Sequence, residues 1–292
     1  MIRKNIVASV LARLRNIAKI RNVIFGEILL RYAVERILKR IEESEYASKC
    51  ILKGGTLLLV WGEGSSYRPT MDVDLELRGD GSPAALVKMF FRIAEMPGEV
   101  EDGVRIDKES IKTVPIRDDD EYGGVRVTMM IFLGKVRIPV QFDVGIGDAI
   151  TPPPKKADFP VLLDGSIPRI KVYPKETVIA EKFETIVKRG LANSRMKDYY
   201  DLWMLSHDVS VDMDMAFHAI ERTFNRRKTD IPKHVPEGLL DEFARNESKI
   251  VQWNAFVRKN RISLPYADFS LVVHDVREFL MGLVRKRDVQ NS

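Results

Sequence analysis

Cysteine, histidine and long apolar runs are all scarce in this sequence. It has one cysteine, Cys50, in 292 residues, so an intramolecular disulfide is impossible, which fits a protein of the reducing cytoplasm. Its four histidines lack the spacing of metal ligands. No apolar run approaches the roughly 20 residues that a membrane-spanning helix requires. Basic residues are spread through residues 1–20 without an apolar core, so we expect no signal peptide and no membrane contact.

What is present is an ordinary globular composition with a mild basic bias. Hydrophobic residues make up 45% and charged residues 30% of the chain, and its 292 residues allow one large domain or two modest ones. The formal net charge is +5. A solvated basic surface and contact with a polyanion such as RNA both explain this excess, so charge alone does not identify a partner.

The most informative segment is residues 72–77, with the sequence DVDLEL. Side chains alternate along a strand, so Asp72, Asp74 and Glu76 share one face and the three apolar residues share the other. Carboxylates on one face repel each other unless a cation neutralises them, and hard oxygen ligands beside a phosphate-bearing substrate suit Mg²⁺. The pattern therefore indicates nucleotidyl transfer.

A third carboxylate lies on a later strand. Runs rich in β-branched residues, separated by glycine-containing turns, predict hairpins over residues 104–116, 125–133 and 136–144. In the last run Gln141 and Asp143 alternate with apolar residues. Asp143 therefore has the parity needed to join Asp72 and Asp74.

Helical segments are predicted on both sides of these strands. Two amphipathic helices lie within residues 7–43, with a break at Asn22, and a strand at 50–52 leads through a Gly54-Gly55 turn to a short helix at 56–61. The proline run at 151–154 predicts a boundary between a domain of residues 1–150 and one of residues 151–292. After a strand at 167–172, helices are predicted over residues 174–189, 197–206, 213–226, 237–258 and 269–286.

Four blocks in this order make the chain resemble the AbiEii nucleotidyl transferase toxin family, the toxin half of bacterial abortive-infection toxin–antitoxin pairs. Two blocks surround the strand carboxylates, LKGGTLL at residues 52–58 and RPTMDVDL at 68–75. Two lie in the predicted helical domain, EKFE at 181–184 and RMKDYYDL at 195–202. Shorter similarities precede them at residues 9–14, 30–32 and 35–41.

The resemblance implies a fold and a set of roles. The fold would be α/β, with a nucleotidyltransferase-like mixed sheet core, an N-terminal helical pair and a C-terminal helical domain. Asp72 and Asp74 would hold Mg²⁺ against the triphosphate, and Asp143 would complete the acidic set or act as a base. Lys182 would bind phosphate and Asp198 would work beside the nucleotide, across a cleft between the two domains. The residues implied to bind the nucleotide are Gly54, Gly55, Thr56, Arg68 and Lys182.

Several side chains near these motifs also have a structural interpretation. Arg68 fits an ion pair with a strand aspartate as well as a phosphate contact, and Lys182 fits a lysine that extends from a buried stripe. Glu181 and Glu184 are expected to be solvated, and Asp201 to cap or pair within its own helix. Aromatic residues at helical spacing favour a core position over base stacking, and this applies to Tyr199, Tyr200 and Trp203. The basic cluster at residues 226–228 fits a solvated helix end as well as an RNA contact.

The function implied is transfer of a nucleoside monophosphate from an NTP to an acceptor hydroxyl. The expected acceptor is RNA, at the 3′ end of tRNA, and a winged-helix antitoxin is an expected partner. Two alternatives stay open, namely nucleotidylation of a protein or small molecule, and a non-catalytic NTP-binding toxin that acts through partner binding. The retained carboxylates argue against the second.

Overall fold

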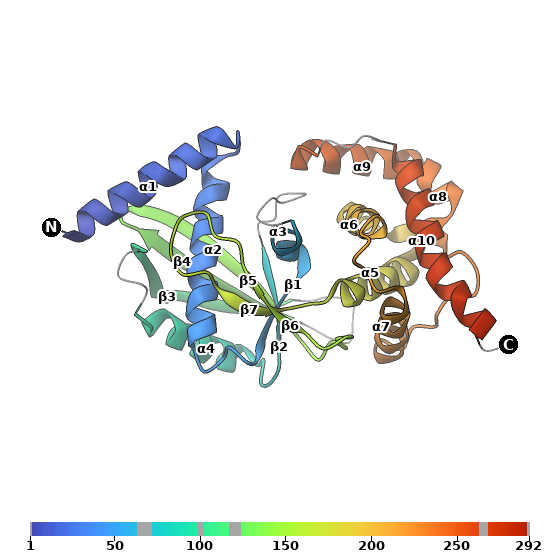
Figure 1. Ribbon diagram of the computed structural model, residues 1–292, viewed down its shortest axis with the longest axis horizontal. Helices are drawn as coiled ribbons and strands as arrows, with labels where there is room; N and C mark the ends of the chain where they lie inside the picture. Colours follow the sequence, from blue (N-terminus) through green and yellow to red (C-terminus); the bar gives the residue numbers. More distant parts are fainter. Residues whose placement is uncertain (1, 63–71, 98–101, 117–123, 263–267, 291–292) are drawn as a thin grey trace. The chain divides into compact units, whose positions relative to one another are not determined.

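The chain divides into two compact units in a computed structural model (Figure 1). One unit is formed by Met1–Gly147 and Lys155–Val172, and the other by Asp148–Pro154 and Tyr173–Ser292. The residues that the structure describes are 2–62, 72–97, 102–116, 124–262 and 268–290. The first unit is a mixed α/β structure and the second is mainly helical, so the predicted fold class is confirmed.

A seven-stranded mixed sheet forms the core of the first unit, in the order β3-β4-β5-β2-β1-β7-β6. β3, β4 and β5 form the predicted antiparallel meander, whereas β2 pairs in parallel with β5 and β1 pairs in parallel with β7. The strands in chain order are β1 (Cys50–Lys53), β2 (Val73–Leu77), β3 (Val104–Pro115), β4 (Val125–Leu133), β5 (Val136–Ile146), β6 (Lys155–Asp158) and β7 (Arg169–Val172).

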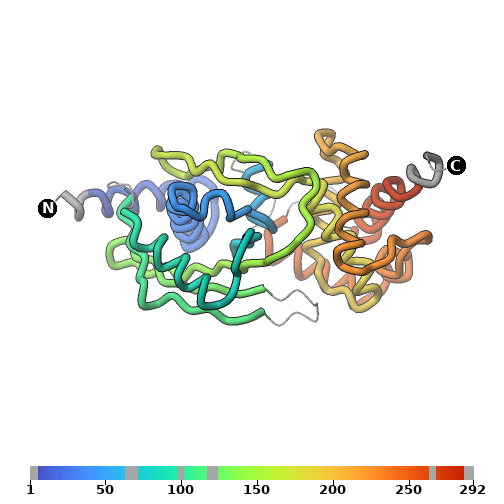
Figure 2. Tube along the Cα trace, turned by 90° about the horizontal axis from the view of Figure 1, so that it is seen from below, coloured from blue at the N-terminus to red at the C-terminus, as the bar shows by residue number. Residues whose placement is uncertain are grey.

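One face of this sheet is apolar and covered by helices. Val73, Leu75, Phe142 and Val144 are buried there. The ring of Phe142 lies 5.1 Å from the ring of Phe90 on α4 (Pro83–Glu95), and α4 runs alongside β3 (Figure 2). The opposite face carries the polar side chains of β2 and β5, as their alternation predicts.

Two helices precede the sheet, as predicted. α1 (Ile2–Ile20) ends before Asn22, whose φ of +51° is tolerated better by asparagine than by most residues. α2 (Phe25–Glu43) buries an apolar stripe that includes Ile37 and Ile41, and it packs against β5, β7 and α4.

Buried polar groups also tie α2 to the rest of its unit. Arg40 and Asp102 are 4% and 5% exposed and pair at 2.9 Å just before β3. Glu35 is buried, lies 3.3 Å from Arg31, and accepts a hydrogen bond from the backbone N–H of Leu162. Burial raises the pKa of Glu35 to about 7, so this carboxyl group is only partly ionised near neutral pH.

Helices make up the second unit around an aromatic core. Tyr199 is buried, its ring stacks on Phe243 at 5.5 Å and its hydroxyl donates to the carbonyl of Gly238, so the core interpretation of this tyrosine is confirmed. No helix in the part of the chain that the structure describes is long and apolar enough to span a membrane. The helices and 3₁₀ turns are α5 (Lys175–Arg189), η2 (Gly190–Ala192), α6 (Met196–Ser206), α7 (Met213–Arg226), η3 (Glu237–Leu239), α8 (Asp241–Arg245), α9 (Glu247–Asn260) and α10 (Phe269–Gln290).

The prediction of one helix over residues 237–258 is wrong. The segment is divided into η3, α8 and α9, because the backbone is extended at Leu240 and again at Asn246. Asn246 caps α9, since its side-chain oxygen accepts a hydrogen bond from the backbone N–H of Ser248. A capping asparagine inside an otherwise periodic stretch marks a new helix start.

Candidate functional site

Four charged residues form a row across neighbouring strands on the polar face of the sheet. The strand registers place Lys53 opposite Asp74, Asp74 beside Asp143, and Asp143 opposite Arg126. Paired residues of neighbouring strands point to the same face, so the row runs cation, anion, anion, cation. The expected parity of Asp143 with Asp74 is confirmed. Asp72 is exposed and precedes the first residue of β2 by one position.

Gly54 lies directly against the Asp74 carboxylate. It opens η1 (Gly54–Thr56), which leads into the short helix α3 (Leu57–Trp61), and its φ is +70°. A Cβ atom at this position would lie 1.9 Å from Oδ2 of Asp74, so a side chain does not fit there. Thr56 is buried and its hydroxyl donates to the backbone carbonyl of Asp72 at 3.2 Å. The Gly-Gly-Thr segment therefore packs against both strand aspartates.

Arg126 holds the carboxylate of Asp143 with two hydrogen bonds. Nε donates to Oδ1 and Nη2 donates to Oδ2, each at 2.9 Å, and the amide of Gln141 also donates to Oδ1 at 3.2 Å. The hydrogen bond to Asp143, together with the charges of Asp143, Asp72 and Asp74, raises the pKa of Arg126. A fixed cation thus lies beside the sheet carboxylates, and Arg126 is not among the predicted site residues.

Glu76, the last carboxylate of the DVDLEL segment, is neutralised from the neighbouring strand. Its side chain is fully buried, and Nζ of Lys53 lies 3.1 Å from Oε2. Gly145 leaves room for this lysine, because a Cβ atom there would lie 2.5 Å from Nζ. Glu76 is therefore the buried member of an ion pair, in contrast to the exposed Asp72.

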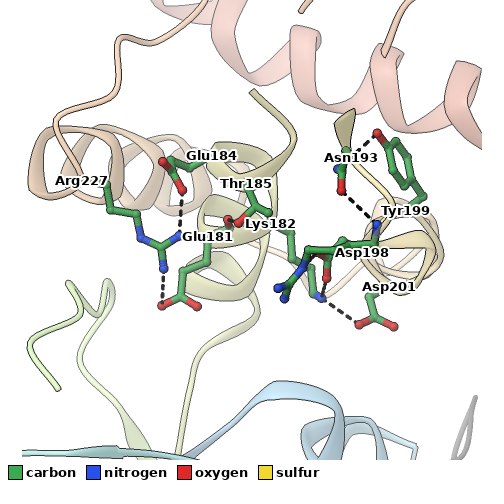
Figure 3. Close-up of polar contacts among 10 residues, drawn as sticks. Glu181, Lys182, Glu184, Thr185, Asn193, Asp198, Tyr199, Asp201 and Arg227 are labelled. Carbon is green, nitrogen blue, oxygen red and sulfur yellow. Dashed lines mark hydrogen bonds and ion pairs between the residues drawn. The ribbon is translucent and has the colours of Figure 1, made fainter. Parts of the chain in front are cut away.

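Lys182 of α5 lies between two carboxylates of α6 in the helical unit (Figure 3). Its Nζ is 2.5 Å from Asp198 and 2.9 Å from Asp201, and Arg195 donates to the other oxygen of Asp198 at 2.7 Å. Burial alone would raise the pKa of Asp198, but the charges of Lys182 and Arg195 outweigh burial and hold it well below its usual range. Asp201 is expected from the sequence to cap or pair within its own helix; the structure shows that it also pairs with Lys182 of α5, one turn after Asp198.

A second cation, the partly buried Arg227, follows the end of α7 (Figure 3). It donates to Glu184 at 2.8 Å and lies 3.8 Å from Glu181 and 3.6 Å from Asp148. Burial opposes the charge of Arg227, but the surrounding carboxylates raise its pKa. Glu184 is 2% exposed, so the expectation that it is solvated is wrong. The same ion pairs show that Arg227 belongs to the contact of α5 with α7 and not to a solvated basic helix end.

Two further observations concern the predicted ligands. Arg68 lies outside the described residues. Among the residues that the structure describes, no group of three or more His, Cys, Asp or Glu side chains is arranged to hold a metal ion.

Two solved structures resemble the chain in fold. MenT4, a nucleotidyltransferase toxin from Mycobacterium tuberculosis H37Rv, is 17% identical with a TM-score of 0.55, and the match covers 89% of this chain and 84% of MenT4. JHP933 from Helicobacter pylori is 13% identical with a TM-score of 0.50, and the match covers 91% of this chain and 94% of that one. No curated protein matches this sequence. The fold class is thus nucleotidyltransferase-like.

A family comparison then identifies the chain. The protein family described as "Nucleotidyl transferase AbiEii toxin, Type IV TA system" matches residues 36–280, which is most of the sequence. The chain therefore belongs to this family. It is a nucleotidyltransferase of the toxin class of toxin–antitoxin systems, with an NTP as substrate and an antitoxin as partner.

Proposed function

We propose that this toxin transfers a nucleoside monophosphate from an NTP to an acceptor hydroxyl of RNA, at the 3′ end of tRNA, with Mg²⁺ as cofactor and a winged-helix protein as antitoxin. The observation that carries the proposal is the in-register pair of Asp74 and Asp143 on the polar face, with Gly54 packed against Asp74. The net charge of +5 supports a polyanionic acceptor, although less strongly.

The sheet carboxylates fit Mg²⁺ by their chemistry. Asp72 and Asp74 supply two hard oxygen ligands, and Mg²⁺ commonly binds through one or two carboxylates while substrate phosphates and water complete its shell. This fits the lack of a larger acidic cluster in the described part of the chain. When bound, the cation would neutralise charge on the triphosphate as the α-phosphorus is attacked.

The remaining roles are proposals that the local contacts support. Gly54 and Gly55 have no side chains, so a phosphate group can approach their backbone, and Thr56 and Arg68 are the other proposed nucleotide contacts. In the helical unit, the proposed phosphate ligand Lys182 is fixed in position by Asp198 and Asp201. A lysine held by two buried carboxylates keeps one rotamer, and this reduces the entropy lost when it binds a ligand.

A labelled-NTP transfer assay tests this function. The protein is incubated with labelled NTP, Mg²⁺ and, separately, total tRNA, total protein or a small-molecule extract. Asp72→Asn and Asp74→Asn should each reduce labelling of tRNA by about a hundredfold or more, since lost charge stabilisation is worth several kcal/mol. Asp158→Asn is the matched control, because this strand aspartate on β6 is 70% exposed and pairs with Arg169.

Each outcome of the assay distinguishes the alternatives. Label on protein or a small molecule, and none on tRNA, would replace the RNA acceptor. NTP binding without transfer to any acceptor would favour a non-catalytic toxin that acts through a partner. Wild-type turnover by Asp74→Asn in saturating Mg²⁺ would refute the assignment of the sheet carboxylates.

A further inference from the structure

We propose that Asp143 acts through Arg126: its carboxylate positions the guanidinium, and Arg126 is the residue that contacts the triphosphate of the bound NTP. The inference rests on the proposed function of the sheet and deepens it. Asp143 is then a positioning residue, in place of a metal ligand or a general base.

Asp143 uses most of its hydrogen-bonding capacity within the hairpin of β4 and β5. An ionised carboxylate has about four lone-pair sites. Two accept from Arg126 and a third accepts from Gln141. The side chain of Asp143 is 18% exposed, so little of it faces outward. Three of about four sites are thus used within the hairpin, two of them to hold Arg126, whereas a metal ligand or a base needs an available oxygen.

Arg126 keeps N–H donors that can bind a ligand. A guanidinium has five N–H groups in a planar fork that matches phosphate oxygens. Two of them donate to Asp143, which leaves three for a ligand. The side chain is 43% exposed, and it feels the charges of both Asp72 and Asp74. Arg126 therefore offers a cation close to the carboxylates that would hold the metal and its triphosphate.

The hairpin of β4 and β5 fixes the position of the Arg126–Asp143 pair. Arg126 and Asp143 are directly opposite each other in an antiparallel pairing that continues without a shift to the turn at Gly134 and Lys135. A contact between two paired strands is held more rigidly than one on a loop, and a group fixed in this way loses little freedom when it binds. This arrangement suits a residue that binds phosphate in a fixed place.

A double-mutant cycle on NTP binding tests the inference. Dissociation constants of an NTP in the presence of Mg²⁺, without acceptor, are measured by calorimetry for Arg126→Gln, Asp143→Asn and the double variant. Each single substitution should weaken NTP binding by about tenfold, as expected for loss of a charged hydrogen bond. The double variant should be no weaker than the singles by more than about twofold, because both act through one contact. Arg126→Lys should stay weakened, since lysine cannot make the two-pronged contact.

Metal binding and a control complete the design. The affinity of the double variant for Mn²⁺, measured without nucleotide, should stay within about twofold of wild type. The two substitutions remove one positive and one negative charge, so the net charge near the proposed metal ligands is unchanged. Arg137→Gln, at an exposed position of β5, should bind NTP like wild type. Loss of Mn²⁺ binding in the double variant, or wild-type NTP affinity in Arg126→Gln, would overturn the inference. A wild-type protein that binds no NTP would instead overturn the proposed function itself.

Discussion

Replacing Gly54 by alanine would put a methyl group where the Asp74 carboxylate now lies. The new Cβ atom would be 1.9 Å from Oδ2, well under the 3.0 Å below which Cβ contacts essentially do not occur, so the carboxylate or the turn must move by about 1 Å. The positive φ of Gly54 adds a backbone cost of roughly 1–2 kcal/mol for alanine. A displacement of this size at a catalytic group typically lowers turnover by about a hundredfold.

A backbone-matched control separates displacement from instability. Gly103→Ala introduces alanine at a similar φ of +66°, where the added Cβ would lie 3.1 Å from the side chain of Leu133 and 3.2 Å from that of Val7. Both variants should lower the melting temperature by a few degrees, but only Gly54→Ala should lose transfer of labelled NMP per folded molecule. If Gly54→Ala keeps wild-type turnover, Asp74 has no role that depends on its position against the turn.

Three further outcomes are expected. Glu35→Gln should flatten the pH dependence of stability. The pKa of Glu35 is about 7 in the folded state against 4.5 ordinarily, so between these values the folded state binds a proton that the unfolded state has lost. The stability of the wild-type protein should therefore fall by up to about 3 kcal/mol as pH rises through this window. Thermal denaturation from pH 4 to 8 measures this, and equal slopes for both proteins would contradict it. Asp102→Ala removes the carboxylate that pairs with the buried Arg40, and it should lower the free energy of unfolding, measured with denaturant, by about 3–5 kcal/mol. A loss under about 1 kcal/mol would show that the pair is dispensable. Affinity for tRNA should fall steeply with salt while NTP affinity falls less, and charge reversal at Arg226 and Lys228 should weaken tRNA binding; a flat salt response would refute an RNA acceptor.

Local pattern was enough to predict most of the sheet and part of the site. Strand alternation predicted that Asp74 and Asp143 share a face, and the register confirms it. The pairing of Arg126 with Asp143 can also be deduced from the sequence. A two-residue turn places Leu133 opposite Val136, and counting seven residues away from the turn along each strand pairs Arg126 with Asp143.

Other features depend on packing between distant segments and leave no local signal. The parallel pairing of β2 with β5 joins strands that are far apart in the chain. Glu184 and Arg227 are 43 residues apart, and each resembles an ordinary charged residue on a helix surface. The inward direction of Asp201 likewise depends on how α5 packs on α6. Charged residues at helical spacing predict a solvated surface, because the sequence alone does not show a partner on another helix.

The chain passes between its two units more than once, so no single cut separates them. The chain changes unit after residues 147, 154 and 172, and Thr151 is hydrogen-bonded through its backbone to the hydroxyl of Thr177. A single cut at residue 150 therefore gives two fragments that each contain part of the other unit, because the C-terminal fragment carries β6 and β7 of the sheet. We expect the nicked protein to stay associated on a sizing column. The fragment 1–150 alone should aggregate, because β1 would become an uncovered sheet edge.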